Sequence, residues 1–94
     1  NDAGAFLALI AGKSLTNRLY VITFQVTPEG AIAGDALGWD VSGVWRWDDG
    51  YFCREMAWGG DPIPYNCQLV EASGNELRFT SDQGSGASAS FKLR

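Results

Sequence analysis

Short stretches in which apolar and polar residues alternate run from about residue 19 to the C-terminus, and only a few residues separate one stretch from the next. Alternation with a period of two is typical of β-strands with one buried face. The connections are too short for crossovers, so neighbouring strands must be antiparallel. This spacing predicts about seven strands. They cover residues 19–26, 31–34, 39–47, 51–58, 66–72, 76–80 and 87–94. In the first, Tyr20, Ile22, Phe24 and Val26 share one face.

The N-terminal segment, residues 2–12, has a helical pattern instead. Asp2 can cap the first free amides, and Phe6, Leu9 and Ile10 fall on one face. A helix of about three turns is not stable alone, so it must pack against an apolar surface.

The length of 94 residues is that of one domain with a thin core. A meander of short strands either closes into a barrel or leaves exposed edges, and closure removes the edges. We therefore predict one mostly β domain over residues 1–94. Its fold class is an antiparallel, barrel-like meander of about seven strands, with the short N-terminal helix packed on or across one end.

Three tryptophans, Trp39, Trp45 and Trp47, share one face of the clearest predicted strand. Core packing is the simplest interpretation of such a face. A barrel lined with tryptophan could instead stack a sugar or another flat ligand.

The hairpin at 48–50 decides which charge points inward. A two-residue turn at Asp49-Gly50 places Trp45 opposite Arg54, whereas a three-residue loop with a bulge turns Glu55 inward instead. We favour the first register because it places more apolar volume inside. A buried charge then needs a partner in the protein or in a ligand.

The two cysteines, Cys53 and Cys67, are the only ones in the chain, which has no histidine. Two thiolates alone rarely hold a metal, and the spacing is not that of a Cys-x-x-Cys redox pair. We expect a disulfide across a hairpin centred near Gly60, and hence an oxidising compartment. The absence of an initiator methionine and a signal peptide would suit a mature exported protein or a trimmed chain.

Several function classes are disfavoured by composition. A net charge of −4 repels a phosphate backbone, and no apolar run is long enough to cross a membrane. We therefore expect no nucleic-acid partner and no membrane insertion. The chain also has no glycine turn for a nicotinamide nucleotide, no calcium loop and no His-dependent triad, so we expect no cofactor and no metal. Carboxylates are the only acid–base groups in quantity, which leaves a carboxylate-based enzyme as a minor alternative.

The predicted loop over residues 59–65 has the composition of a contact site at the barrel end. Trp58 and Tyr65 flank a glycine-led stretch stiffened by two prolines, with Arg54 predicted beneath them. Aromatic anchors beside a rigid loop favour a binding role for these three residues. The alternative is that Trp58 belongs to the core and the loop only connects strands.

Long segments of the chain carry a family resemblance. They are GVWRWDDGYFCREMAWGG, YNCQLVEASGNELRFTSDQGSG, FKLR, LALIAGKSLT and VTPEGAIAG. They resemble a family of small exported alphaproteobacterial proteins whose members often carry the name dihydrodipicolinate reductase. The nucleotide and catalytic motifs of such a reductase are absent here, so the resemblance implies export and the Cys53–Cys67 pair but no activity.

We predict from these features a periplasmic or secreted, non-enzymatic binding module. In architecture the chain is similar to small disulfide-bearing barrels that inhibit lysozymes or secreted proteases, which favours a protein partner. A small-ligand carrier using the barrel interior is the second prediction, and an enzyme is the third. A cavity of at least ~300 Å³ would favour the carrier, and a filled barrel the protein binder.

Overall fold

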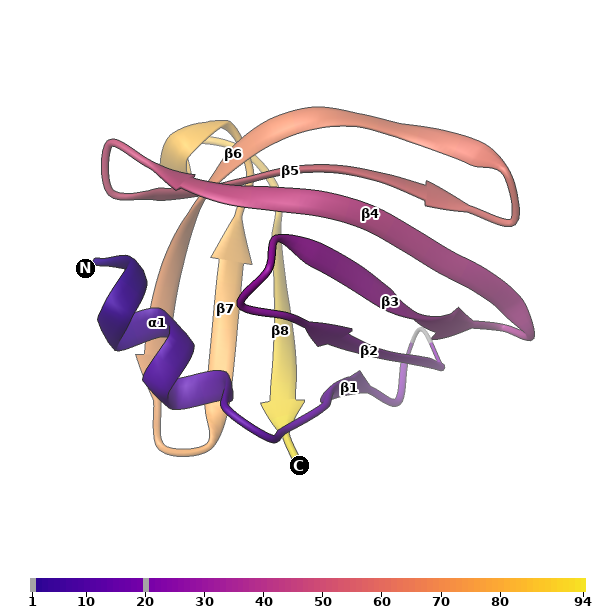
Figure 1. Ribbon diagram of the computed structural model, residues 1–94, viewed down its shortest axis with the longest axis horizontal. Coiled ribbons are helices and arrows are strands. Elements are labelled where there is room, and N and C mark those ends of the chain that lie inside the picture. The colour runs from indigo at the N-terminus through magenta and orange to yellow at the C-terminus, as the bar shows by residue number, and fades with distance from the viewer. Residues whose placement is uncertain (1, 20) are drawn as a thin grey trace.

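The computed structural model describes residues 2–19 and 21–94 (Figure 1), so the predicted inward position of Tyr20 lies outside the described residues. Within them, one α-helix precedes eight strands and a short 3₁₀ turn. The helix is α1 (Ala3–Ile10); the strands are β1 (Leu15–Asn17), β2 (Ile22–Val26), β3 (Ala31–Ala36), β4 (Trp39–Asp48), β5 (Tyr51–Trp58), β6 (Asp61–Ser73), β7 (Glu76–Thr80) and β8 (Ser88–Leu93); the 3₁₀ turn is η1 (Asp82–Gly84).

The strands form a closed antiparallel barrel, as the alternation predicts. Each strand pairs with the next, and β1 pairs with β8 through Leu15↔Leu93 and Thr16↔Lys92. The prediction missed β1, because three residues are too few to show alternation. That strand closes the barrel and leaves neither β2 nor β8 as a free edge there.

The β4–β5 hairpin has the two-residue turn that places Arg54 inward. Asp49 and Gly50 have φ of 54° and 83°, the left-handed values that such a turn requires. Trp45 therefore pairs with Arg54, and Arg54 rather than Glu55 faces the interior.

The predicted loop over 59–65 is wrong, because β6 already begins at Asp61. Gly59 and Gly60 form a two-residue turn with φ of 56° and 91°. The first part of β6 pairs only with β5, so its other edge is free and tolerates Pro62 and Pro64, which have no amide hydrogen to donate.

A bulge interrupts the β5–β6 ladder at this point. Met56 pairs with Ile63 and Arg54 with Asn66, so the single residue between them on β5 faces two on β6. The bulge shifts the pairing by one residue and brings Cys53 directly opposite Cys67. The predicted disulfide is present, with an S–S distance of 2.08 Å.

Helix α1 closes one end of the barrel. Asp2 caps it by accepting a hydrogen bond from the amide of Ala5 at 2.7 Å, and the helix ends at Ile10, earlier than predicted. Its Phe6 is buried among four rings 5.3–6.4 Å away between centroids. These rings belong to Trp45, Trp47, Phe52 and Phe79. At eight residues, the single α-helix of the described chain is too short to cross a membrane.

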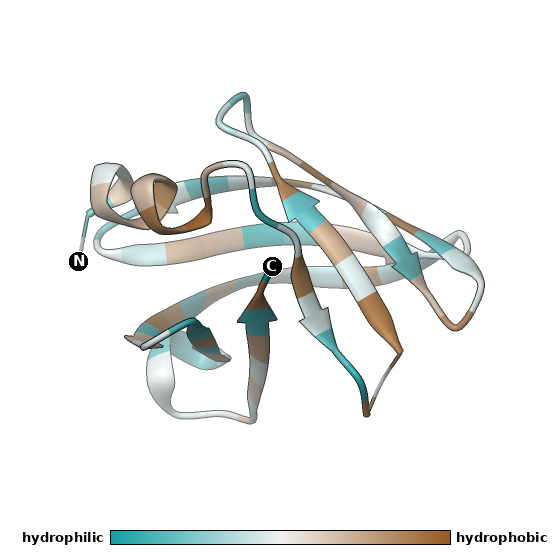
Figure 2. Cartoon of the chain, turned by 90° about the horizontal axis from the view of Figure 1, so that it is seen from below, coloured by the Kyte–Doolittle hydropathy of each residue, from teal (hydrophilic) through white to brown (hydrophobic). Residues whose placement is uncertain are grey.

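The two ends of the barrel differ, because the connections of a meander lie alternately at one end and the other. Helix α1 covers the helix end. The β1–β2, β3–β4 and β5–β6 connections lie on the side away from it, at the right of Figure 1, which we call the open end. Apolar and polar residues alternate along the strands (Figure 2). The buried core gathers around Phe6, Leu15, Phe52, Leu77 and Phe79, toward the helix end.

Candidate binding site at the open end

A cavity of about 280 Å³ occupies the barrel interior, and we call it the inner cavity. Its walls are mostly apolar and include four phenylalanine rings. The lining residues are Ile22, Phe24, Ile32, Phe52, Arg54, Met56, Ile63, Gln68, Phe79, Ser81, Ala87, Ser88, Ala89 and Phe91. Core side chains therefore fill the helix end but leave space behind the open end.

A second hollow of about 290 Å³ lies beside the inner cavity, and we call it the rim hollow. It shares Ile22, Met56 and Ile63 with the inner cavity. Its remaining lining is also apolar and consists of Leu19, Ala36, Leu37, Val41 and Trp58. We call these two adjacent spaces together the recess.

Two glycines on the inward faces of β3 and β4 allow close approach of the neighbouring strands. Gly34 and Gly43 share the inward strand faces with Ile32 and Val41, yet carry nothing beyond the backbone. A Cβ at Gly34 would lie 2.1 Å from the carbonyl oxygen of Thr23, and one at Gly43 would lie 2.5 Å from that of Glu55. The strands approach too closely there for any larger residue.

Arg54 is the one charged side chain lining either space within the described chain. Its Nη1 donates a hydrogen bond of 2.7 Å to the carbonyl oxygen of Pro64 at the bulge. Burial lowers the pKa of the Arg54 guanidinium, which still keeps its charge at neutral pH. An arginine thus faces an apolar recess with a backbone carbonyl as its protein partner.

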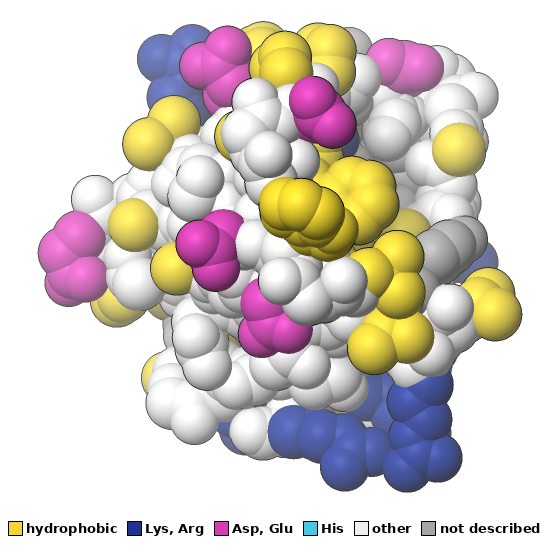
Figure 3. All heavy atoms as spheres, turned by 90° about the vertical axis from the view of Figure 1, so that its right-hand side faces the viewer, with side chains coloured by type: hydrophobic (Ala, Val, Ile, Leu, Met, Phe, Trp, Pro, Cys, Tyr) yellow, Lys and Arg dark blue, Asp and Glu magenta, His cyan; other side chains and the backbone are white. Residues whose placement is uncertain are grey.

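Exposed apolar side chains surround the mouth of the recess. We call Leu19, Val21, Leu37, Trp39 and Trp58 the apolar rim. Figure 3 shows apolar side chains gathered on this end of the molecule, with acidic side chains nearby. Clusters of this kind mark contact sites more often than scattered single residues do.

Two rim residues have backbone conformations that their side chains disfavour. Leu37 has φ of 53° at the first position of its turn, and the β-branched Val21 has φ of 50°. Such values suit glycine, asparagine or aspartate, and are uncommon for bulky residues. Strain of this kind often accompanies function, so it adds weight to the rim as a contact site.

The prediction of Trp39 as a core residue is wrong. Its side chain is 61% exposed and lies over the β5–β6 turn, where a Cβ on Gly59 would come within 3.0 Å of the indole. Trp45 and Trp47 do pack against the core. Trp39 differs because it begins β4 beside the turn, beyond the part of the barrel that encloses the interior.

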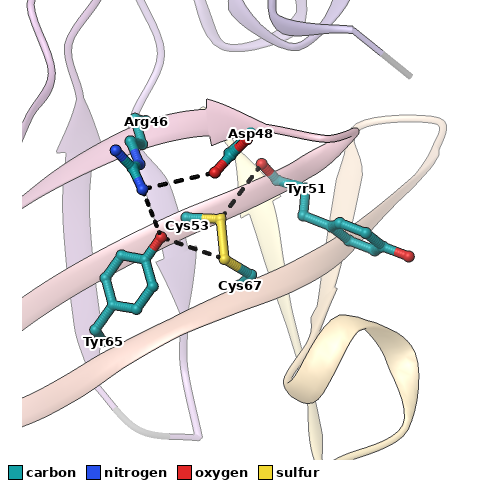
Figure 4. A network of polar contacts seen from close by, with 6 residues as sticks. All are labelled: Arg46, Asp48, Tyr51, Cys53, Tyr65 and Cys67. Atoms are coloured by element: carbon teal, nitrogen blue, oxygen red, sulfur yellow. Dashed lines mark hydrogen bonds and ion pairs between the residues drawn. A yellow bond between two sulfur atoms is a disulfide. The ribbon is translucent and has the colours of Figure 1, made fainter.

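The structure brings together two of the three predicted binding residues and separates the third. Arg54 lines the inner cavity, and Trp58 lines the rim hollow with its indole N–H donating to the carbonyl oxygen of Ala36 at 2.8 Å. Tyr65 lies on the outer face, where its hydroxyl is 3.4 Å from Nη2 of Arg46 and 3.4 Å from Sγ of Cys67 (Figure 4). The bulge explains this, because without it Tyr65 would stand opposite Arg54.

A small polar wall borders the recess on the side of β6, β7 and β8. Gln68 donates to the hydroxyl oxygen of Ser81 at 3.3 Å, and Ser88 also lines the cavity. Asn66 holds the neighbouring turn η1 by donating to the Asp82 carboxylate at 2.8 Å and accepting from its amide at 2.9 Å. Sequence reasoning missed this wall because it depends on the bulge and on the β7–β8 connection.

Every aspartate and glutamate in the chain is exposed, and none lines the recess. Within the described residues, no three histidine, cysteine or acidic side chains come close enough to hold a metal ion. Comparison with known protein families, curated proteins and solved structures finds no match to this chain.

Proposed function

We propose that this protein is an exported, non-enzymatic binding module that holds a small, largely apolar molecule in the recess at its open end. The observation that carries the proposal is an interior that the chain does not fill. The inner cavity and the rim hollow share three lining residues, and the walls of both are mostly apolar. Small-molecule sites typically have mostly apolar walls, a few polar groups and at least ~300 Å³ of space. The inner cavity, at about 280 Å³, falls just below that size, and the rim hollow adds about 290 Å³ beside it.

The side chains around the recess favour binding over catalysis. Acid–base chemistry by carboxylates would need two of them beside the bound molecule, and none lines the recess. The disulfide fits an oxidising compartment, which supports a periplasmic or secreted location. A binding module outside the cytoplasm is the simplest function that satisfies these features.

A protein partner is the second candidate, and the apolar rim favours it. Trp39 lies outside both spaces, is 61% exposed and packs against Gly59 of the β5–β6 turn, and exposed aromatic residues of this kind often anchor protein interfaces. A Trp39→Ser variant separates the two functions. It should leave small-molecule binding intact but weaken a protein complex at least tenfold.

The proposal can be tested with 1-octanol as an uncharged probe, followed by tryptophan fluorescence because Trp58 lines the rim hollow. Ala89 faces the inner cavity, so Ala89→Phe should fill it and abolish a saturable response. Ala33→Phe is the matched control, since Ala33 is exposed on the barrel surface. Circular dichroism verifies that both variants keep the native β signal.

The expected result is saturable binding by the wild type and by Ala33→Phe, and none by folded Ala89→Phe. A folded wild type without a saturable response would contradict the proposal. Equal responses from both variants would also contradict it, because the probe would then bind outside the cavity.

A further inference from the structure

The inner cavity contains one charge, and its protein surroundings leave that charge without an anion. Among residues 2–19 and 21–94, the ion pairs within 4.0 Å are Arg46–Asp48 and Arg78–Glu71, and neither involves Arg54. A guanidinium has five N–H donors, and the hydrogen bond to Pro64 uses one nitrogen. No buried side-chain nitrogen in the described chain lacks a partner, so the other guanidinium nitrogens of Arg54, which lines the inner cavity, remain accessible.

This arrangement has a free-energy cost that an anionic ligand would offset. Arg54 is half-buried, and partial removal of a cation from water without a counter-charge is unfavourable, which is also why burial lowers the pKa of Arg54. The planar fork of arginine matches the two oxygens of a carboxylate. With no acidic side chain in the recess, the local charge favours anions and disfavours cations.

The polar wall adds a second donor on the same side of the cavity. The Ser81 oxygen accepts from Gln68 at 3.3 Å, which leaves its own hydroxyl hydrogen free to donate to a ligand. The rest of the lining is mostly apolar and includes Phe24 on β2 and Phe91 on β8. A molecule that fills this space needs one anionic group and an apolar body.

The cavity volume sets the size of that body. At ~30 Å³ for each water-sized group, a space of about 280 Å³ holds roughly nine such groups. The rim hollow allows a longer tail to extend between Leu37 and Trp58 to the surface.

We propose that the ligand is a small apolar monocarboxylate, with its carboxylate on Arg54 and its apolar body among the phenylalanines of the inner cavity. This inference rests on the proposed function, since it names the chemical class bound by the same recess.

The test compares octanoate with octanamide, its uncharged counterpart of the same shape, by isothermal titration calorimetry. We expect wild-type protein to bind octanoate at least tenfold more tightly, because the carboxylate gains charge-assisted hydrogen bonds to Arg54. Arg54→Gln should lose this preference, and Arg54→Lys should keep part of it because the charge remains without the fork. Arg78→Gln is the matched control, since it removes the same charge from the outer face.

The outcomes separate this inference from the proposed function. Equal binding of octanoate and octanamide, or an unchanged preference in Arg54→Gln, would overturn the monocarboxylate inference and leave the recess as a binding site. Absence of binding of both compounds by the folded wild type would overturn both. Loss of the preference in Arg54→Gln, with the preference retained in Arg78→Gln, is the result that supports the inference.

Discussion

At the scale of single residues, the β3–β4 and β4–β5 turns share a left-handed backbone conformation at their first residue but place very different side chains there. Asp49 has φ of 54° in the β4–β5 turn, where aspartate suits that conformation. Leu37 has φ of 53° in the β3–β4 turn, where a branched apolar side chain does not suit it. Because Leu37 lines the rim hollow, its side chain there is better explained by binding than by folding.

Replacing Leu37 by asparagine should therefore stabilise the protein and weaken ligand binding. Relief of the left-handed strain is expected to raise the free energy of unfolding by up to about 1 kcal/mol. For a domain of this size, that corresponds to a rise in Tm of about 4–8 °C. Calorimetric scans measure the Tm and titration measures affinity, with Asp49→Asn as the control that changes neither. A lower Tm for Leu37→Asn would show that Leu37 serves the fold.

Single positions near the bulge show where sequence reasoning succeeds and fails. The inward position of Arg54 follows from the Asp49-Gly50 turn, whose residues specify its length. The outward position of Tyr65 depends on one extra residue in β6, which reverses every side chain after it. No glycine marks that bulge, so alternation alone could not place Tyr65.

At the scale of elements, the disulfide joins β5 to β6 just after the bulge. Tyr51 and Tyr65 lie beside it, and Arg46 extends across it from β4 (Figure 4). The hydrogen bond with Tyr65, followed by the charge of Asp48, raises the pKa of Arg46. The Cys53–Cys67 disulfide thus fixes the β5–β6 pairing at the point where the bulge has shifted it by one residue.

Reduction of the disulfide should destabilise the barrel by about 3 kcal/mol, the loop-entropy value for a closed loop of roughly 15 residues. Urea unfolding of the oxidised protein and of Cys53→Ser/Cys67→Ser measures the difference. Mass spectrometry after alkylation provides the direct check, because the bonded protein takes up no alkyl group unless it is reduced. Two freely alkylated thiols in the protein as isolated would contradict the bond.

Helix α1 covers one end of the barrel, and we expect Phe6 to provide most of the stability that the helix adds. Phe6→Ala removes a buried ring that contacts Trp45 and Phe52, and large-to-small changes of this kind typically cost about 3–5 kcal/mol. Urea denaturation measures the loss. Leu9→Ala, on the exposed side of the same helix, is the control and should cost less than about 1 kcal/mol. Similar losses in both variants would contradict the role given to Phe6.

Element boundaries were predictable where patterns were long and failed where they were short. β4 and β5 carry enough alternating residues around a marked turn to be found from the sequence. β1 has three residues, and β6 begins with a Pro-containing stretch that resembles a loop. Both depend on tertiary pairing rather than on local preference.

At the scale of the whole molecule, Phe6 of helix α1 packs into the aromatic core of the barrel, whereas the interior beyond that core keeps a cavity of about 280 Å³. Sequence reasoning gave the barrel and the inward Arg54, but it could not give the cavity, which depends on the sum of side-chain volumes across several strands. From the sequence alone, Gly34 and Gly43 only weaken their predicted strands. The structure shows that the neighbouring strand lies too close at both positions for a larger residue. The site therefore combines one predictable charge with a space that only the assembled barrel reveals.

The indole N–H signals of Trp58 and Trp45 come from opposite ends of the barrel and allow the most direct test of binding at the open end. Trp58 donates to Ala36 beside the rim hollow, and Trp45 donates to Thr27 near the helix end, each at 2.8 Å. In an NMR titration with octanoate, we expect the Trp58 indole and amides lining the recess to shift saturably while the Trp45 indole stays in place. Shifts confined to the helix end or the outer face, or no shifts at millimolar octanoate, would contradict a ligand site in the recess.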